Sequence, residues 1–88
     1  MTVLDEGLAY FDAAEYDKAY AALIGLAEDG NDEAQYLIGL LYYRGDHVEL
    51  SVDDAIKWFK RSARKNNIEA MNMLMETEGT TTRHTNRF

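Results

Sequence analysis

The sequence predicts an all-α protein, a short solenoid of about five antiparallel helices that make two and a half helix-turn-helix repeats. Proline is absent from the 88 residues, and alanine, leucine, glutamate and lysine are frequent where apolar residues recur every three to four positions. This spacing favours helix. The pattern itself recurs after 32 to 36 residues, and such a period is typical of a helical solenoid.

Five apolar stripes define the predicted helices. Asn31 is an N-cap residue followed by two acids that suit the start of the third helix, and Ser51 with Asp54 forms an approximate capping box at the start of the fourth. Asn66 tolerates the left-handed backbone that ends a helix. The short links favour antiparallel packing of neighbours. The predicted helices are roughly 2–13, 16–29, 32–44, 52–65 and 68–78.

A chain of this length forms one domain, which we expect to cover residues 1–79. Residues 80–88, "TTTRHTNRF", are polar and lack an apolar face, so they are expected to form a disordered tail. The start, "MTVLDEG", has no signal-peptide character, and no apolar stretch approaches the ~20 residues that span a bilayer. With no cysteine either, we expect a cytoplasmic protein without disulfides or a membrane anchor.

Charge is distributed unevenly along the chain. The net charge is −7, and residues 1–35 hold nine acids against Lys18 alone. Residues 57–65, "KWFKRSARK", hold five bases and no acid. An acidic body repels phosphates, which argues against nucleic-acid binding. The basic segment is either a solvated helix face or a docking site, and the solvated face is favoured because cations suit the end of a helix.

The internal repeat explains the aromatic residues of the segment 36–59. A shift of 36 residues places Leu23 on Phe59 and aligns several alanines, and a shift of 32 places Gly7 on Gly39. Small residues at these positions let a neighbouring helix approach, and the large side chain nearby fills the space. The aromatic residues are therefore predicted to pack the repeat rather than to line a catalytic pocket.

The residues of the central unit resemble the Sel-one-like repeat, a relative of the tetratricopeptide repeat. One full unit matches from about residue 32 to 67, preceded by a shorter tetratricopeptide-like unit and followed by the first helix of a third. His47 stands where the family has a loop glycine, and Met75 where it has a helix glycine. The matching residues are Ala34, Ile38, Gly39, Tyr42, Gly45, Val48, Ala55, Trp58, Phe59 and Ala63.

The resemblance implies a right-handed solenoid in which the first helix of each unit lines a concave groove. Tyrosine and arginine are enriched at binding hot spots, so these helices are expected to bind an extended or helical peptide. The alternative is that several of these side chains simply pack against the neighbouring unit. The predicted groove residues are Leu8, Phe11, Asp12, Glu33, Tyr36, Leu40, Tyr43, Arg44, Asn72 and Glu76.

Candidate catalytic and metal-binding residues are few. His47 with Asp46 and Glu49 lacks the paired His or Cys spacing of metal sites. Asp53 and Asp54 are adjacent on a helix, so they point about 100° apart and suit the helix dipole better than acid–base chemistry. The sequence predicts no catalytic residue, cofactor or metal, and we do not expect an enzyme.

The function predicted from these observations is a protein–protein interaction module, an adapter or scaffold that binds a peptide or protein segment. The alternative is an acidic inhibitor or immunity-type protein that masks a basic surface of its target, motivated by the acid-rich first 35 residues. Met71, Met73 and Met75 in the last helix are either core fillers or an adaptable contact surface. They would form a homodimer interface if exposed.

Overall fold

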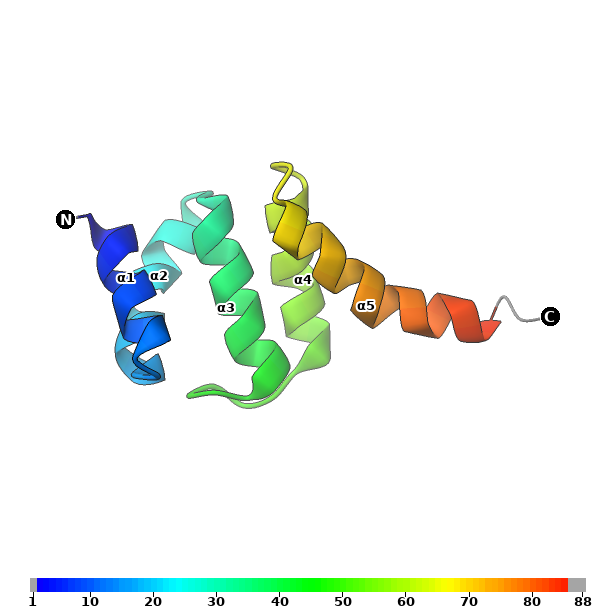
Figure 1. The fold of residues 1–88 in the computed structure, drawn as a ribbon, viewed down its shortest axis with the longest axis horizontal. Coiled ribbons are helices and arrows are strands. Elements are labelled where there is room, and N and C mark those ends of the chain that lie inside the picture. Colours follow the sequence, from blue (N-terminus) through cyan, green and yellow to red (C-terminus); the bar gives the residue numbers. More distant parts are fainter. Residues whose placement is uncertain (1, 86–88) are drawn as a thin grey trace.

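The computed structural model describes residues 2–85, with the side chains of residues 2–77, and this part of the chain contains five α-helices and no strand (Figure 1). The all-α prediction is confirmed, and the first four helices end within two residues of their predicted bounds. The helices are α1 (Val3–Asp12), α2 (Tyr16–Glu28), α3 (Asp32–Arg44), α4 (Val52–Ala63) and α5 (Ile68–Thr85).

Each helix packs against the next helix in the chain, in the order α1, α2, α3, α4 and α5. In Figure 1, α1, α3 and α5 lie toward the viewer, and α2 and α4 lie behind them. The molecule measures 50 × 25 × 18 Å along its principal axes, with α5 projecting from one end. Stepwise packing along one axis is compatible with the predicted solenoid.

The turns that follow α1, α2 and α4 share one hydrogen-bonding pattern. After α1, the Ala14 N–H donates to the Phe11 carbonyl and the Glu15 N–H donates to the Tyr10 carbonyl. This is the Schellman motif, which needs one residue in the left-handed region. Ala14 (φ 61°) fills that place here, whereas Gly30 (φ 109°) and Asn66 (φ 69°) fill it in the two later turns.

Two asparagines that are 36 residues apart begin α3 and α5 in the same way. The Asn31 side chain accepts a hydrogen bond from the Ala34 N–H, and the Asn67 side chain accepts one from the Ala70 N–H, both at 2.9 Å. Asn67 also donates to the carboxylate of Asp32 at 2.9 Å. The cap of the later unit is thereby tied to the first turn of the unit before it.

Replacing Asn67 by alanine is expected to lower the free energy of unfolding by about 1–2 kcal/mol, because it removes both the helix cap and the bond to Asp32. Thr2→Ala removes the capping box at the exposed start of α1 and is expected to cost about 1 kcal/mol or less. Urea unfolding followed by circular dichroism measures both. A greater loss for Thr2→Ala would contradict the role given to Asn67.

The repeat is also visible in the core, where each unit places a glycine against a large apolar side chain. A Cβ atom added at Gly7 would lie 2.6 Å from Cγ of Leu23, and one added at Gly39 would lie 2.6 Å from Cε1 of Phe59. Both large side chains are fully buried. The buried apolar residues are Ala19, Leu23, Ala27, Ala34, Leu37, Ile38, Leu40, Leu41, Ala55, Phe59 and Ala70.

The predicted end of the last helix near residue 78 is wrong, because α5 continues to Thr85, seven residues further. Gly79 does not end the helix, since a single glycine costs only about 1 kcal/mol in a helix interior and no proline follows it. Residues 86–88 lie outside the described residues. The division into a domain of residues 1–79 and a disordered tail stays a prediction.

Candidate binding face

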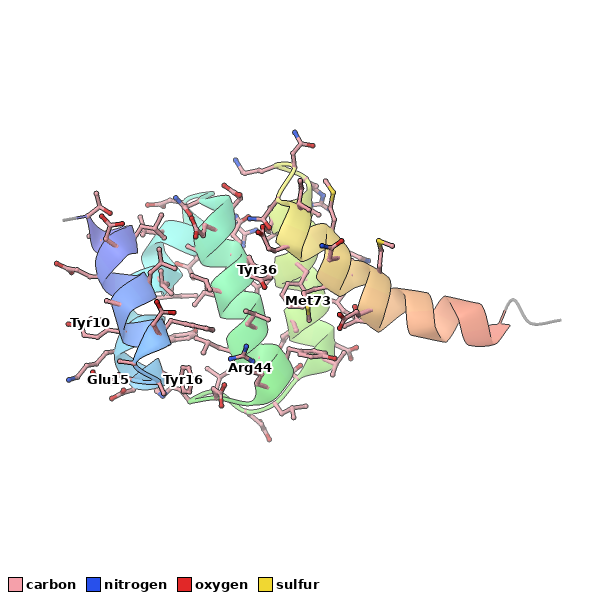
Figure 2. The ribbon with its side chains drawn as sticks, in the orientation of Figure 1. Tyr10, Glu15, Tyr16, Tyr36, Arg44 and Met73 are labelled. Carbon is pink, nitrogen blue, oxygen red and sulfur yellow. The ribbon has the colours of Figure 1, made fainter. Side chains whose placement is uncertain are left out.

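The predicted groove residues lie on α1, α3 and α5, the helices that face the viewer in Figure 2, where Tyr36, Arg44 and Met73 are labelled. We call this surface the first-helix face. Leu40 is only 7% exposed and belongs to the core, so a partner would reach the other nine residues more readily. Leu8, Phe11, Tyr36 and Tyr43 are half-buried, whereas Asp12, Glu33, Arg44, Asn72 and Glu76 are exposed.

Between α1 and α3, the structure brings two predicted residues together. The guanidinium carbon of Arg44 lies 5.5 Å from the ring centroid of Phe11, which is cation–π distance. Phe11 in turn meets Tyr16 edge-to-face, with ring centroids 5.6 Å apart. Arg44 also lies 3.9 Å from a carboxylate oxygen of Asp46. These contacts hold the arginine at the surface where the two repeat units meet.

Where α3 packs against α4, two tyrosines of α3 contact the buried ring of Phe59. The ring centroids of Tyr36 and Tyr43 lie 6.1 and 6.5 Å from that of Phe59. Both tyrosines remain half-buried, and Met73 of α5 packs on the same core. These two tyrosines therefore pack on α4 of their own unit, while part of each side chain stays accessible.

The phenol of Tyr36 lies within the electrostatic range of three charged groups. Burial raises the pKa of Tyr36, the carboxylates of Glu69 and Glu76 raise it further, and Arg44 lowers it. The charges of an arginine of its own helix and of two acids of α5 thus act on this phenol in opposite directions. Of these three groups, Arg44 and Glu76 are among the predicted groove residues.

Two residues were not predicted from the sequence: Glu69, which lies on α5, and Tyr16 of α2, which contacts Phe11 of this face. Glu69 is seven residues before Glu76, a two-turn spacing that places both on the same side of a helix. That signal was available in the sequence, although it is common on solvated helices. Tyr16 begins α2 and reaches Phe11 only because the turn after α1 reverses the chain, which no local pattern indicates.

A second group of aromatic residues lies at the α3–α4 loop. The ring of His47 lies 5.4 Å from that of Tyr20, centroid to centroid. A hydrogen bond with Tyr20, together with burial, raises the pKa of Tyr42 to about 12. His47 has φ 69°, so it adopts the left-handed backbone that a glycine would adopt more readily. Within the described residues, no group of three His, Cys, Asp or Glu could hold a metal ion.

The adjacent acids Asp53 and Asp54 serve the start of α4. The Asp54 N–H donates to the Ser51 hydroxyl at 3.1 Å, which is the predicted N-cap. The Asp54 carboxylate lies 3.9 Å from the Lys57 ammonium. Asp53 is exposed in the first helical turn. These contacts are those of a capped helix, where acids in the first turn offset the helix dipole.

The methionines of α5 differ in exposure. Met75 is 71% exposed, Met71 is also exposed, and Met73 is half-buried against the core. Met75 lies 36 residues after Gly39, so it has the equivalent position in the repeat. In the earlier unit, this is the position where the second helix packs against the first. A homodimer through Met71, Met73 and Met75 stays a prediction. None of the described helices is both long enough and apolar enough to cross a membrane.

A comparison with curated proteins gives one relative. Over 41 residues, which are 47% of this chain, the sequence is 44% identical to a sel1-like repeat-containing protein of Acanthamoeba polyphaga mimivirus. The chain spans 7% of the length of that viral protein. No protein-family model matches the chain, and no solved structure matches it. Over nearly half of its length, the chain is therefore similar to a sel1-like repeat protein.

Proposed function

We propose that the protein is a non-enzymatic interaction module of the sel1-like kind, an adapter that binds a peptide or protein segment in a groove along α1, α3 and α5. The arrangement of Arg44 carries the proposal. Its side chain is held against Phe11 of the preceding unit while remaining 46% exposed. A positioned arginine beside half-buried aromatic rings has the composition of a binding hot spot.

Similarity to the sel1-like repeat protein supports the same proposal. Tyr36 and Tyr43 add half-buried aromatic surface beside Arg44, and tyrosine offers a large contact area with a polar group at its tip. Leu8 and Phe11 continue this surface onto α1, with Asp12 and Glu33 at its exposed edge. The remaining contacts would come from Asn72 and Glu76 of α5.

A quantitative pull-down from lysate of the source organism, at low and high salt, tests this function. The double variant Tyr43→Ala, Arg44→Ala is expected to retain about tenfold less of a specific partner than the wild type at either salt concentration, because it removes two central contacts. The control is Lys57→Ala, Arg64→Ala, which removes two exposed side chains, one in α4 and one at its C-cap. Circular dichroism confirms that both variants are folded.

A partner that the double variant retains at high salt would contradict the proposal. The acidic inhibitor is the second candidate, because the acids of the first 35 residues are exposed apart from the half-buried Asp32. Binding through those acids would be lost steeply with salt, since exposed charges are screened. A partner lost at high salt but unaffected by the double variant would favour the inhibitor and remove the groove.

A further inference from the structure

The surface between α3 and α5 carries charges of opposite sign at different positions, with aromatic surface between them. Arg44 is the one base among the ten predicted groove residues and lies at the end of α3. Glu69 and Glu76 lie on α5 and act on the phenol of Tyr36 near the start of α3. Figure 2 labels Tyr36 on α3 and Met73 on α5, with Arg44 at the far end of α3.

The basic end is built to meet an anionic group. Stacking on Phe11 restrains the guanidinium, which lowers the entropy lost when a partner binds. The contact with Asp46 measures 3.9 Å, which is longer than a hydrogen bond. Guanidinium has five N–H donors in a planar fork that matches a carboxylate. A carboxylate of a partner is therefore the group that Arg44 fits best.

The acidic end has the opposite preference. Glu69 and Glu76 are both exposed, and their spacing places them on one side of α5 about 10 Å apart. Asn72 and Met73 lie between them in sequence. A lysine or arginine placed between the two acids would be attracted by both, and its stem would lie over Met73 and the ring of Tyr36.

The separation of the two ends sets a spacing in the partner. Tyr36 and Arg44 are eight residues apart on α3, which is about 12 Å at 1.5 Å per residue. An extended peptide advances about 3.3 Å per residue. Two side chains that reach both ends would therefore be about three to four residues apart.

We infer that the α3–α5 surface binds an extended peptide segment in which an acidic residue stands three to four positions from a basic one. The acid lies against Arg44, the base lies against Glu69 and Glu76, and the residues between them cover Tyr36 and Tyr43. This inference rests on the proposed function and specifies the partner's charge pattern. A segment with charges of one sign alone would be attracted at one end and repelled at the other.

A random peptide library displayed on phage and selected on the full chain provides the test. Peptides are retained for sequencing when they bind the wild type and fail to bind Tyr43→Ala. We expect acid–base pairs at three- or four-residue spacing to be enriched over the unselected library. A selected peptide should bind Arg44→Gln about two- to fivefold more weakly, the range for an exposed ion pair. Replacing its acid by glutamine should abolish that difference.

Matched variants complete the design. The double variant Glu69→Gln, Glu76→Gln should weaken peptides with the basic residue by a similar factor and leave peptides lacking it unchanged. Arg64→Gln and Glu28→Gln, both exposed and away from this surface, should not affect binding. The inference would be overturned if the Tyr43-dependent peptides lacked the charge pair, or if Arg44→Gln left their affinity unchanged. Either result would leave the proposed function standing. Recovery of no Tyr43-dependent peptide would overturn both.

Discussion

Replacing Phe59 by alanine is expected to lower the free energy of unfolding by about 3–5 kcal/mol, the range for a large aromatic residue removed from a core. Phe59 is fully buried in α4, and its ring meets Tyr36, Tyr43 and the backbone of Gly39. Its loss would leave a cavity where α3 and α4 meet. A folded chain of 88 residues is expected to have a total stability of about 4–13 kcal/mol, so much of the protein's stability would disappear.

Urea unfolding followed by circular dichroism measures this loss, with Phe59→Leu as the matched control. Leucine is the residue that the first unit uses at the equivalent position, Leu23, and it keeps most of the apolar contact. We expect Phe59→Leu to cost about 1–2 kcal/mol, in the range of core substitutions that keep an apolar side chain. An alanine variant as stable as the leucine variant would show that this ring does not organise the core.

Replacing Gly39 by alanine is expected to cost about 2–3 kcal/mol, the upper part of the range for overpacking a filled core. The added Cβ atom would lie 2.6 and 2.7 Å from two ring atoms of Phe59. The ring is rigid and is itself held between Tyr36 and Tyr43, so α3 and α4 must move apart to accept a methyl group. Thermal and urea unfolding both report the change.

Two other glycines provide the controls for Gly39→Ala. At Gly7 the added atom would meet Leu23, a side chain that can change rotamer, so we expect a smaller loss of about 1 kcal/mol. At Gly25, in the interior of α2, nothing lies within 4 Å, and alanine should stabilise the helix by about 0.5–1 kcal/mol. If all three variants were equally stable, close packing of the glycines would not hold the units together.

Much of the fold could be predicted from the sequence because the signals involved are local or repeated. Apolar spacing, the N-caps Asn31 and Ser51, and the left-handed tolerance of Asn66 each lie within a few residues of the helix end that they mark. The internal repeat then related Gly7 to Gly39 and Leu23 to Phe59, and the structure pairs them accordingly. The end of α5 was missed because neither proline nor a strong cap stands there.

The candidate site was less predictable. Helical spacing predicts on which side of a helix a residue lies, but it does not predict how much of that side chain a neighbouring helix buries. Leu40 follows the same spacing as Tyr36 and Tyr43, yet it is buried. Glu69 was indicated only by a two-turn spacing that is common on solvated helices, and Tyr16 of α2 reaches Phe11 through a contact that no local pattern indicates. Their relation to the first-helix face depends on how separate helices pack.

The sequence by itself determined that the chain is helical, where the first four helices lie, and which small and large residues recur, since these properties follow from nearest neighbours and composition. Only the tertiary structure decided that Arg44 of one unit lies against Phe11 of another and that the charges of Arg44, Glu69 and Glu76 all act on the phenol of Tyr36. The physical reason is that charge and aromatic contacts depend on distances between helices. Those distances are set by how the glycines and rings of the core pack.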